Sequence, residues 1–79
     1  MSGPVDVLAA RRARLVQRML HADTHGSNAL ANGNACRESG KVEQAERYYE
    51  KGQYWLDESN RCRDKITEID ALAHAGSAP

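Results

Sequence analysis

Residues 36–45 read CRESGKVEQA, and the Ser39-Gly40 pair within them is the clearest turn signal in this 79-residue chain. Glycine readily adopts the left-handed conformation that ends many helices, so Gly40 is expected to end one helix shortly before another begins. Because Gly40 lies close to mid-chain, the two halves can fold back on each other. The sequence therefore predicts an all-α fold, an antiparallel hairpin of two long helices in one domain.

The flanking segments set the expected helix boundaries. Ser2-Gly3-Pro4 is a helix-start signal, because the N–H that proline lacks would be unpaired in the first turn anyway. Beyond Gly40, only Gly52 interrupts a composition that favours helix until Gly76. The prediction is a first helix over about 4–38, a second over 41–75 and a disordered tail over 76–79.

Residues 23–34, which read DTHGSNALANGN, are poor helix formers. Gly26 and Gly33 each cost a helix about 1 kcal/mol relative to alanine. Two alternatives remain open at this point. Either the first helix runs through the segment at that cost, or it breaks near residues 23–28 and the chain forms a three-helix bundle.

Apolar and small residues recur at 3-4-3-4 spacing in both halves, the pattern of a helix–helix seam. The first half supplies Leu8, Arg12, Leu15, Met19, Ala22, Gly26, Ala29, Gly33 and Cys36, and the second half supplies Ala45, Tyr48, Gly52, Trp55, Ser59, Cys62, Ile66, Ile69 and Ala73. Folding about Gly40 brings the two series together. Gly26 would then lie near Trp55, and we expect the small residues of the first half to leave room for the aromatic cluster of residues 48–55. Larger side chains at Gly26 or Gly33 are expected to collide with Tyr48 or Trp55.

A second row of apolar residues lies outside this seam. Its members are Ala9, Ala13, Val16 and Leu20 in the first half, and Tyr49 and Leu56 in the second. A domain of this size is marginally stable alone. The row therefore predicts self-association into a helical bundle, with a dimer preferred, and a non-enzymatic protein-interaction or oligomerisation module that could also take another protein partner.

Four arginines make the first helix basic, and they allow two interpretations. They are Arg11, Arg12, Arg14 and Arg18. They could contact phosphates, which would make the chain a nucleic-acid-binding accessory protein. Alternatively, the hairpin register brings Arg11 to Asp70, Arg14 to Glu68 and Arg18 to Asp64. Internal pairing is preferred, because no aromatic residue lies among the arginines to stack on bases.

The remaining candidate chemistry is sparse. His21 and His25 have the i,i+4 spacing of helical zinc ligands, yet two histidines make half a site. Cys36 and Cys62 lie about 25 Å apart along the expected hairpin, too far for a disulfide. We expect no enzymatic activity, no cofactor and no metal.

Charge and hydropathy bear on partners and compartment. Eleven basic and 11 acidic residues give zero formal net charge, so no global attraction to nucleic acid or acidic lipid is expected. No apolar run approaches the ~18 residues needed to span a bilayer. The expectation is a cytoplasmic protein that does not associate with membranes.

Residues 29–57 follow the pattern A-x-x-x-G-x-x-C-x-x-x-G-x-x-x-x-A-x-x-x-Y-x-x-G, which resembles one tetratricopeptide helical hairpin. The small, turn and aromatic positions of that repeat match Gly33, Gly40, Ala45, Tyr49 and Gly52. Ala29, Asn32 and Asp57 depart from its aromatic, leucine and proline. The resemblance implies a unit of two antiparallel helices, but one copy cannot form the peptide-binding groove of that family.

Residues 40–66, GKVEQAERYYEKGQYWLDESNRCRDKI, are similar to the central segment of small Kle-type proteins of broad-host-range plasmids. That resemblance implies a plasmid-maintenance accessory role without enzymatic activity.

Overall fold

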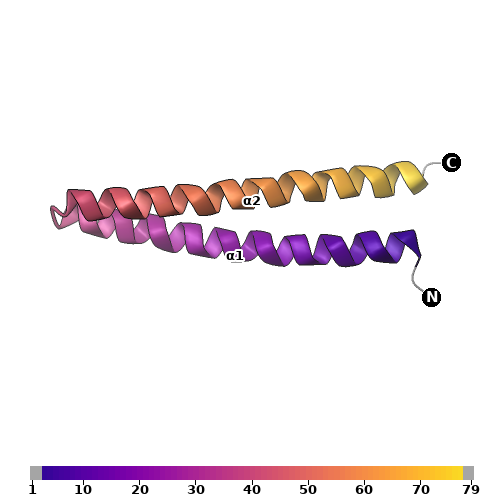
Figure 1. Ribbon diagram of the computed structural model, residues 1–79, viewed down its shortest axis with the longest axis horizontal. Coiled ribbons are helices and arrows are strands. Elements are labelled where there is room, and N and C mark those ends of the chain that lie inside the picture. The colour runs from indigo at the N-terminus through magenta and orange to yellow at the C-terminus, as the bar shows by residue number, and fades with distance from the viewer. Residues whose placement is uncertain (1–2, 78–79) are drawn as a thin grey trace.

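The computed structural model describes residues 3–77, which form two α-helices joined by a tight turn. Helix α1 spans Pro4–Glu38 and helix α2 spans Val42–Ser77. The helices run antiparallel and side by side, so the start of α1 and the end of α2 both lie at the end of the hairpin opposite the turn (Figure 1). The predicted all-α helical hairpin is confirmed.

The turn is built as the sequence predicts. Gly40 has φ of 79°, in the left-handed region that favours glycine. The N–H of Lys41 donates to the carbonyl of Cys36 at 2.8 Å, and the N–H of Gly40 donates to the carbonyl of Arg37 at 3.0 Å. These two bonds define a Schellman motif, which pairs the last carbonyl groups of α1 while reversing the chain.

The alternative of a break near residues 23–28 is wrong, because α1 is continuous through this segment. The propensity cost of Gly26 and Gly33 is offset by packing, since both glycines and the intervening Ala29 are buried against α2. Residues 76 and 77 were also predicted to belong to the disordered tail, which is wrong for these two residues. Residues 76 and 77 belong to α2, whereas residues 78–79 lie outside the described part of the chain.

Within residues 6–75, every buried residue occupies one of the predicted seam positions. The largest apolar cluster joins Leu15 of α1 to Cys62, Ile66 and Ile69 of α2, with Leu8, Val16 and Met19 packed against it. Nearer the turn the seam is lined by small residues, among them Ala22, Ala29 and Ala45. Arg12 and Ala73 are exposed, and five other seam positions are only half-buried: Leu8, Met19, Cys36, Tyr48 and Trp55.

The glycines admit different side chains from those expected. A methyl group at Gly33 would lie 2.8 Å from Cε1 of Tyr49, and one at Gly52 would lie 2.9 Å from Cδ2 of Leu30. Gly26 is instead close to the Gly52 backbone, and a methyl group there would meet only ordinary contacts at 3.5–3.6 Å. The ring that packs against Gly33 is therefore that of Tyr49. Gly26 lies against the Cβ of Trp55 and not against its indole ring.

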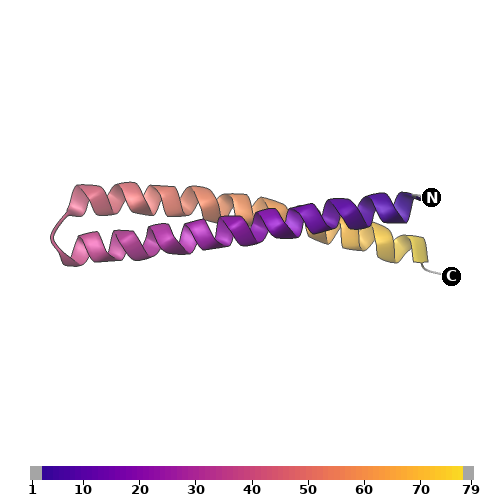
Figure 2. The same ribbon diagram turned by 90° about the horizontal axis from the view of Figure 1, so that it is seen from below.

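The hairpin is long and thin, measuring 60 × 22 × 12 Å. Turned by 90°, the helices are seen to cross, so their axes are inclined to each other (Figure 2). Two helices share one seam, and each broad side of the pair is left open. In an antiparallel pair, residues one position after the seam on both helices share one side, and residues one position before it share the other.

Candidate functional site

We call the side one position after the seam the apolar face, which carries all six residues of the predicted self-association row and Leu30. Of these, Val16, Leu30, Tyr49 and Leu56 are half-buried, and Leu20 is 55% exposed. Ala9 and Ala13 are also exposed. Sequence reasoning missed Leu30, although it lies 14 residues after Val16 and so continues the same row at the heptad period.

Tyr49 is tied to its own hairpin more closely than the other members of the apolar face. Its ring lies against Gly33, and its hydroxyl donates a 2.7 Å hydrogen bond to Oδ1 of Asn34. Tyr49, which was predicted to lie on the self-association face, therefore also fixes the packing of α2 on α1.

A polar layer crosses the apolar face near the middle of the hairpin. Ser59 is 1% exposed, and its hydroxyl donates to one carboxylate oxygen of Asp23, while Arg63 donates to the other oxygen at 3.1 Å. The hydrogen bond to Asp23 gives the buried Ser59 hydroxyl the partner that buried hydroxyl groups require. Ser59 stood in the seam pattern, but nothing in the spacing identified its partner.

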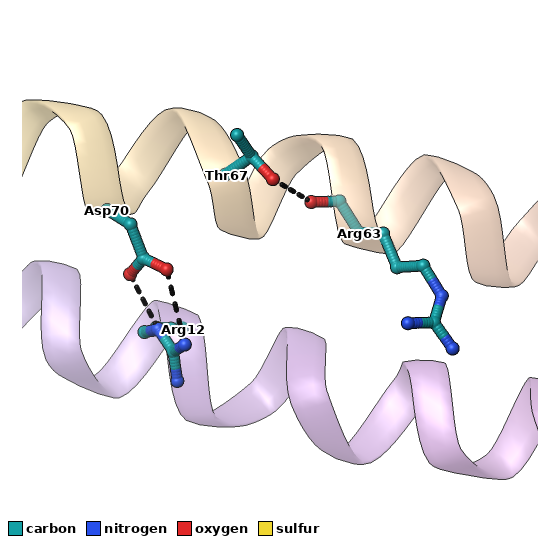
Figure 3. A network of polar contacts seen from close by, with 4 residues as sticks. All are labelled: Arg12, Arg63, Thr67 and Asp70. Atoms are coloured by element: carbon teal, nitrogen blue, oxygen red, sulfur yellow. Dashed lines mark hydrogen bonds and ion pairs between the residues drawn. The ribbon is translucent and has the colours of Figure 1, made fainter.

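A second ion pair lies nearer the chain ends. Nε of Arg12 is 2.7 Å from Oδ1 of Asp70, and a second nitrogen of Arg12 donates to Oδ2 at 3.3 Å. Figure 3 shows both side chains reaching across from opposite helices, and Arg63 extending from α2 toward α1. The expected Arg11–Asp70 pair is therefore wrong. Arg12, which occupies the seam side of α1, takes the place of Arg11.

Two carboxyl groups have lowered pKa values. The hydrogen bond from Arg12, with its charge, lowers the pKa of Asp70 below the usual 3.8. The hydrogen bond from Arg61, assisted by the charge of Arg18, lowers the pKa of Glu58 below the usual 4.5. In both cases the folded chain favours the ionised carboxylate.

The stability of the hairpin is therefore expected to fall in acid. A carboxyl group whose pKa is lower in the folded state contributes stability that is complete above its ordinary pKa and is lost as the pH falls through the lowered value. Thermal unfolding of the parent should show a falling midpoint as the pH drops below about 4, and Asp70→Asn should show a smaller fall.

The control is Asp64→Asn, which removes an exposed carboxylate that forms no ion pair within residues 3–77. This variant should follow the parent. An Asp70→Asn protein with the full acid dependence of the parent would contradict the prediction.

We call the opposite side, one position before the seam, the basic face. Between its helices lies a groove of about 380 Å³ lined by Arg11, Arg14, Leu15, Arg18 and Lys65. Arg18 pairs with Glu58 at 2.9 Å, and Arg61 pairs with the other oxygen of Glu58 at 2.7 Å. The expected Arg18–Asp64 pair is therefore wrong. Glu58 directly precedes the buried Ser59 and so lies beside α1, whereas Asp64 is exposed on the outer side of α2.

The other cations of this groove have no such partner. Within residues 3–77, Arg11, Arg14 and Lys65 form no ion pair, and the expected Arg14–Glu68 pair is not made. The acidic side chains of α2 therefore neutralise only part of the arginine run.

Four ring side chains continue the basic face toward the turn. The rings of His25 and Trp55 are stacked with centroids 4.9 Å apart, and His21 contacts the edges of both. Tyr54 packs edge-on against Trp55 at 5.2 Å and is 59% exposed. Trp55, predicted to fill the seam, thus lies at its margin, because the two histidines one turn apart offer it a surface outside the seam.

The described residues hold no group of three or more His, Cys, Asp or Glu side chains placed to bind a metal ion. His21 and His25 contact each other and Trp55, while the intervening Asp23 is engaged by Ser59 and Arg63 on the apolar face. Cys36 and Cys62 are both free thiols.

Neither helix, over the residues described, has an apolar stretch long enough to cross a membrane. Comparisons of the chain with protein-family models, curated proteins and solved structures return no match. The functional interpretation is therefore based on the two faces of the hairpin.

Proposed function

We propose that this chain is a self-association module in which two copies pack their apolar faces together into a four-helix bundle. The observation that carries the proposal is Leu20, which is 55% exposed among the half-buried side chains of Val16, Leu30 and Leu56. A helix pair with an apolar row outside its seam is normally covered by further helices.

The exposed area supports the same conclusion. The hairpin exposes 6040 Å², whereas a compact monomer of 8.7 kDa is expected to expose about 4,700 Å². The excess of about 1,300 Å² exceeds the roughly 800 Å² that each partner contributes to a standard interface. Covering one broad face would thus bring the exposed area of each hairpin close to that of an ordinary folded domain of the same mass.

Two ion pairs on the apolar face would give such an association a defined register. Arg12–Asp70 and Arg63–Asp23 lie on either side of Val16 along the hairpin axis. Charged groups at fixed positions among apolar ones favour the packing that leaves each pair satisfied and disfavour shifted ones. The proposed dimer therefore has one defined register.

The test compares two leucines of similar exposure on opposite faces. Leu20→Glu places a charge in the proposed interface, whereas Leu72→Glu places one at a position that is 61% exposed and lies on the basic face. Sedimentation equilibrium at micromolar concentration should give a dimer mass for the parent and Leu72→Glu, and a monomer mass for Leu20→Glu. Circular dichroism should show all three to be helical.

Two outcomes would contradict this proposal. The first is a parent chain that remains monomeric at the highest concentration reached while unfolding cooperatively. The second is an equal loss of association in the two leucine variants, which would place the interface elsewhere.

A further inference from the structure

The basic face has no role in the proposed dimer, and three grooves follow one another along it toward the turn. The arginine groove described above is followed by the rings of His21, His25 and Trp55. A second groove of about 280 Å³ then runs between α1 and α2, where Asn28 and Asn32 face Lys51. A third groove, lined by Gln44, Arg47, Tyr48 and Lys51, continues to the turn.

The charge of this surface is strongly one-sided although the chain as a whole is neutral. Within the described residues the face carries these cations: Arg11, Arg14, Arg18, Arg47, Lys51, Arg61 and Lys65. The same face carries two carboxylates. Glu58 is already paired with Arg18 and Arg61, and Glu68 lies on this face because it directly precedes the buried seam residue Ile69. A net positive surface of this extent attracts a polyanion.

The aromatic residues point to the kind of polyanion. Trp55 is half-buried on His25, and Tyr54 exposes more than half of its surface beside it. Exposed rings among cationic grooves suit single-stranded nucleic acid, because phosphates pair with the cations while unstacked bases lie on the rings. Amide side chains at Asn28 and Asn32 add hydrogen-bonding groups suited to base edges.

We propose that the basic face binds single-stranded nucleic acid, with phosphates held by Arg11, Arg14 and Lys65 and bases stacked on Tyr54 and Trp55. From Arg11 to Asn32 the face is about 32 Å long, at 1.5 Å per helical residue. An acidic row lies at the outer edge of α2 and is formed by Glu43, Glu50, Asp57 and Asp64. These carboxylates would repel the phosphates and so keep the strand over the grooves between α1 and α2. This site does not depend on the proposed dimer, which would use the opposite face.

The test is a titration of the full chain with a fluorescein-labelled oligothymidylate longer than the face, followed by anisotropy over a range of salt concentrations. The parent should bind, and its affinity should fall steeply as salt is raised. Arg14→Gln should weaken binding and reduce the slope of log affinity against log salt by about 0.7. Tyr54→Ala should weaken binding by about 5- to 150-fold, the loss expected for one stacked base.

The matched control is Arg12→Gln, which removes the same charge two positions away from a side chain that is paired with Asp70 instead of lining the groove. Its affinity and salt slope should stay close to those of the parent. Trp55 is the only tryptophan, so its fluorescence should be quenched by the oligonucleotide and unaffected by inorganic polyphosphate. Circular dichroism establishes that each variant is folded.

Several results would overturn the proposal. Absence of binding at low salt would remove the site, and equal losses in Arg12→Gln and Arg14→Gln would show that the face is not specific. Polyphosphate that competes as well as the oligonucleotide, with Tyr54→Ala unchanged, would show a general anion surface that does not stack bases. Binding to acidic phospholipid vesicles without binding to the oligonucleotide would assign the face to a membrane surface.

Discussion

Replacing Ile66 by alanine is expected to destabilise the hairpin by about 2–5 kcal/mol, because it removes a buried side chain and leaves a cavity. Ile66 is 9% exposed and belongs to the main cluster with Leu15, Cys62 and Ile69. A domain of this kind has about 5–15 kcal/mol of stability in total, so the loss is a large share of it. Urea denaturation at fixed protein concentration measures the change, since self-association would make stability depend on concentration.

Leu72→Ala serves as the control for this measurement. Leu72 is on the same helix but is 61% exposed, so its truncation should change stability by no more than about 0.5 kcal/mol. If Ile66→Ala costs no more than Leu72→Ala, the cluster around Leu15 is not the core of the fold.

Replacing Gly33 by leucine is the second large change, and we expect it to destabilise the fold although leucine is the better helix former. The gain in helix propensity is somewhat under 1 kcal/mol. Against it, even the first carbon of the new side chain would lie 2.8 Å from Cε1 and 2.9 Å from Cδ1 of Tyr49. The Tyr49 ring is held by its hydrogen bond to Asn34, and overpacking of this kind typically costs about 1–3 kcal/mol.

Gly26→Ala provides a control on the same helix. Its methyl group would meet neighbours at 3.5–3.6 Å, which is ordinary contact, so the propensity gain should appear as an increase in stability of up to about 1 kcal/mol. The double variant Gly33→Leu with Tyr49→Ala should recover part of the loss, because the two residues touch and their effects do not add. Strict additivity, or a Gly33→Leu chain more stable than the parent, would show that Tyr49 packs elsewhere.

The spacing of apolar residues does not distinguish adjacent positions on these two helices. Tyr48 and Tyr49, like Arg11 and Arg12, differ by one position and so by about 100° around the helix. The 3-4-3-4 spacing favoured Tyr48 as the side chain opposite Gly33 and Arg11 as the partner of Asp70, and the structure assigns both roles to the neighbouring residue. A hydrophobic period leaves the rotation of each helix uncertain by about this amount, because 3.5 and 3.6 residues per turn diverge along a long helix.

The aromatic residues of the basic face illustrate a second limit. Within α1 no aromatic residue lies among the arginines, which argued against nucleic-acid binding. Trp55 and Tyr54 come from the other helix and are brought beside His21 and His25 only when the hairpin closes. A surface composed from two helices cannot be seen by inspecting either one.

The sequence by itself determined the turn at Ser39-Gly40, the all-α class and the positions from which the buried residues among 6–75 are drawn, because these depend on local backbone preference and on periodicity. Only the tertiary structure decided that α1 continues through residues 23–34, since packing against α2 outweighs a propensity cost that the isolated segment would bear. It also decided that the ring of Tyr49 packs against Gly33 and that Asp23 accepts the hydrogen bond of Ser59. Within residues 3–77 it left Arg11 and Arg14 without an ion pair, while Arg12 pairs with Asp70. Each of these depends on the rotation of one helix against the other, which is fixed by the fit of side chains across the seam and not by the sequence of either helix alone.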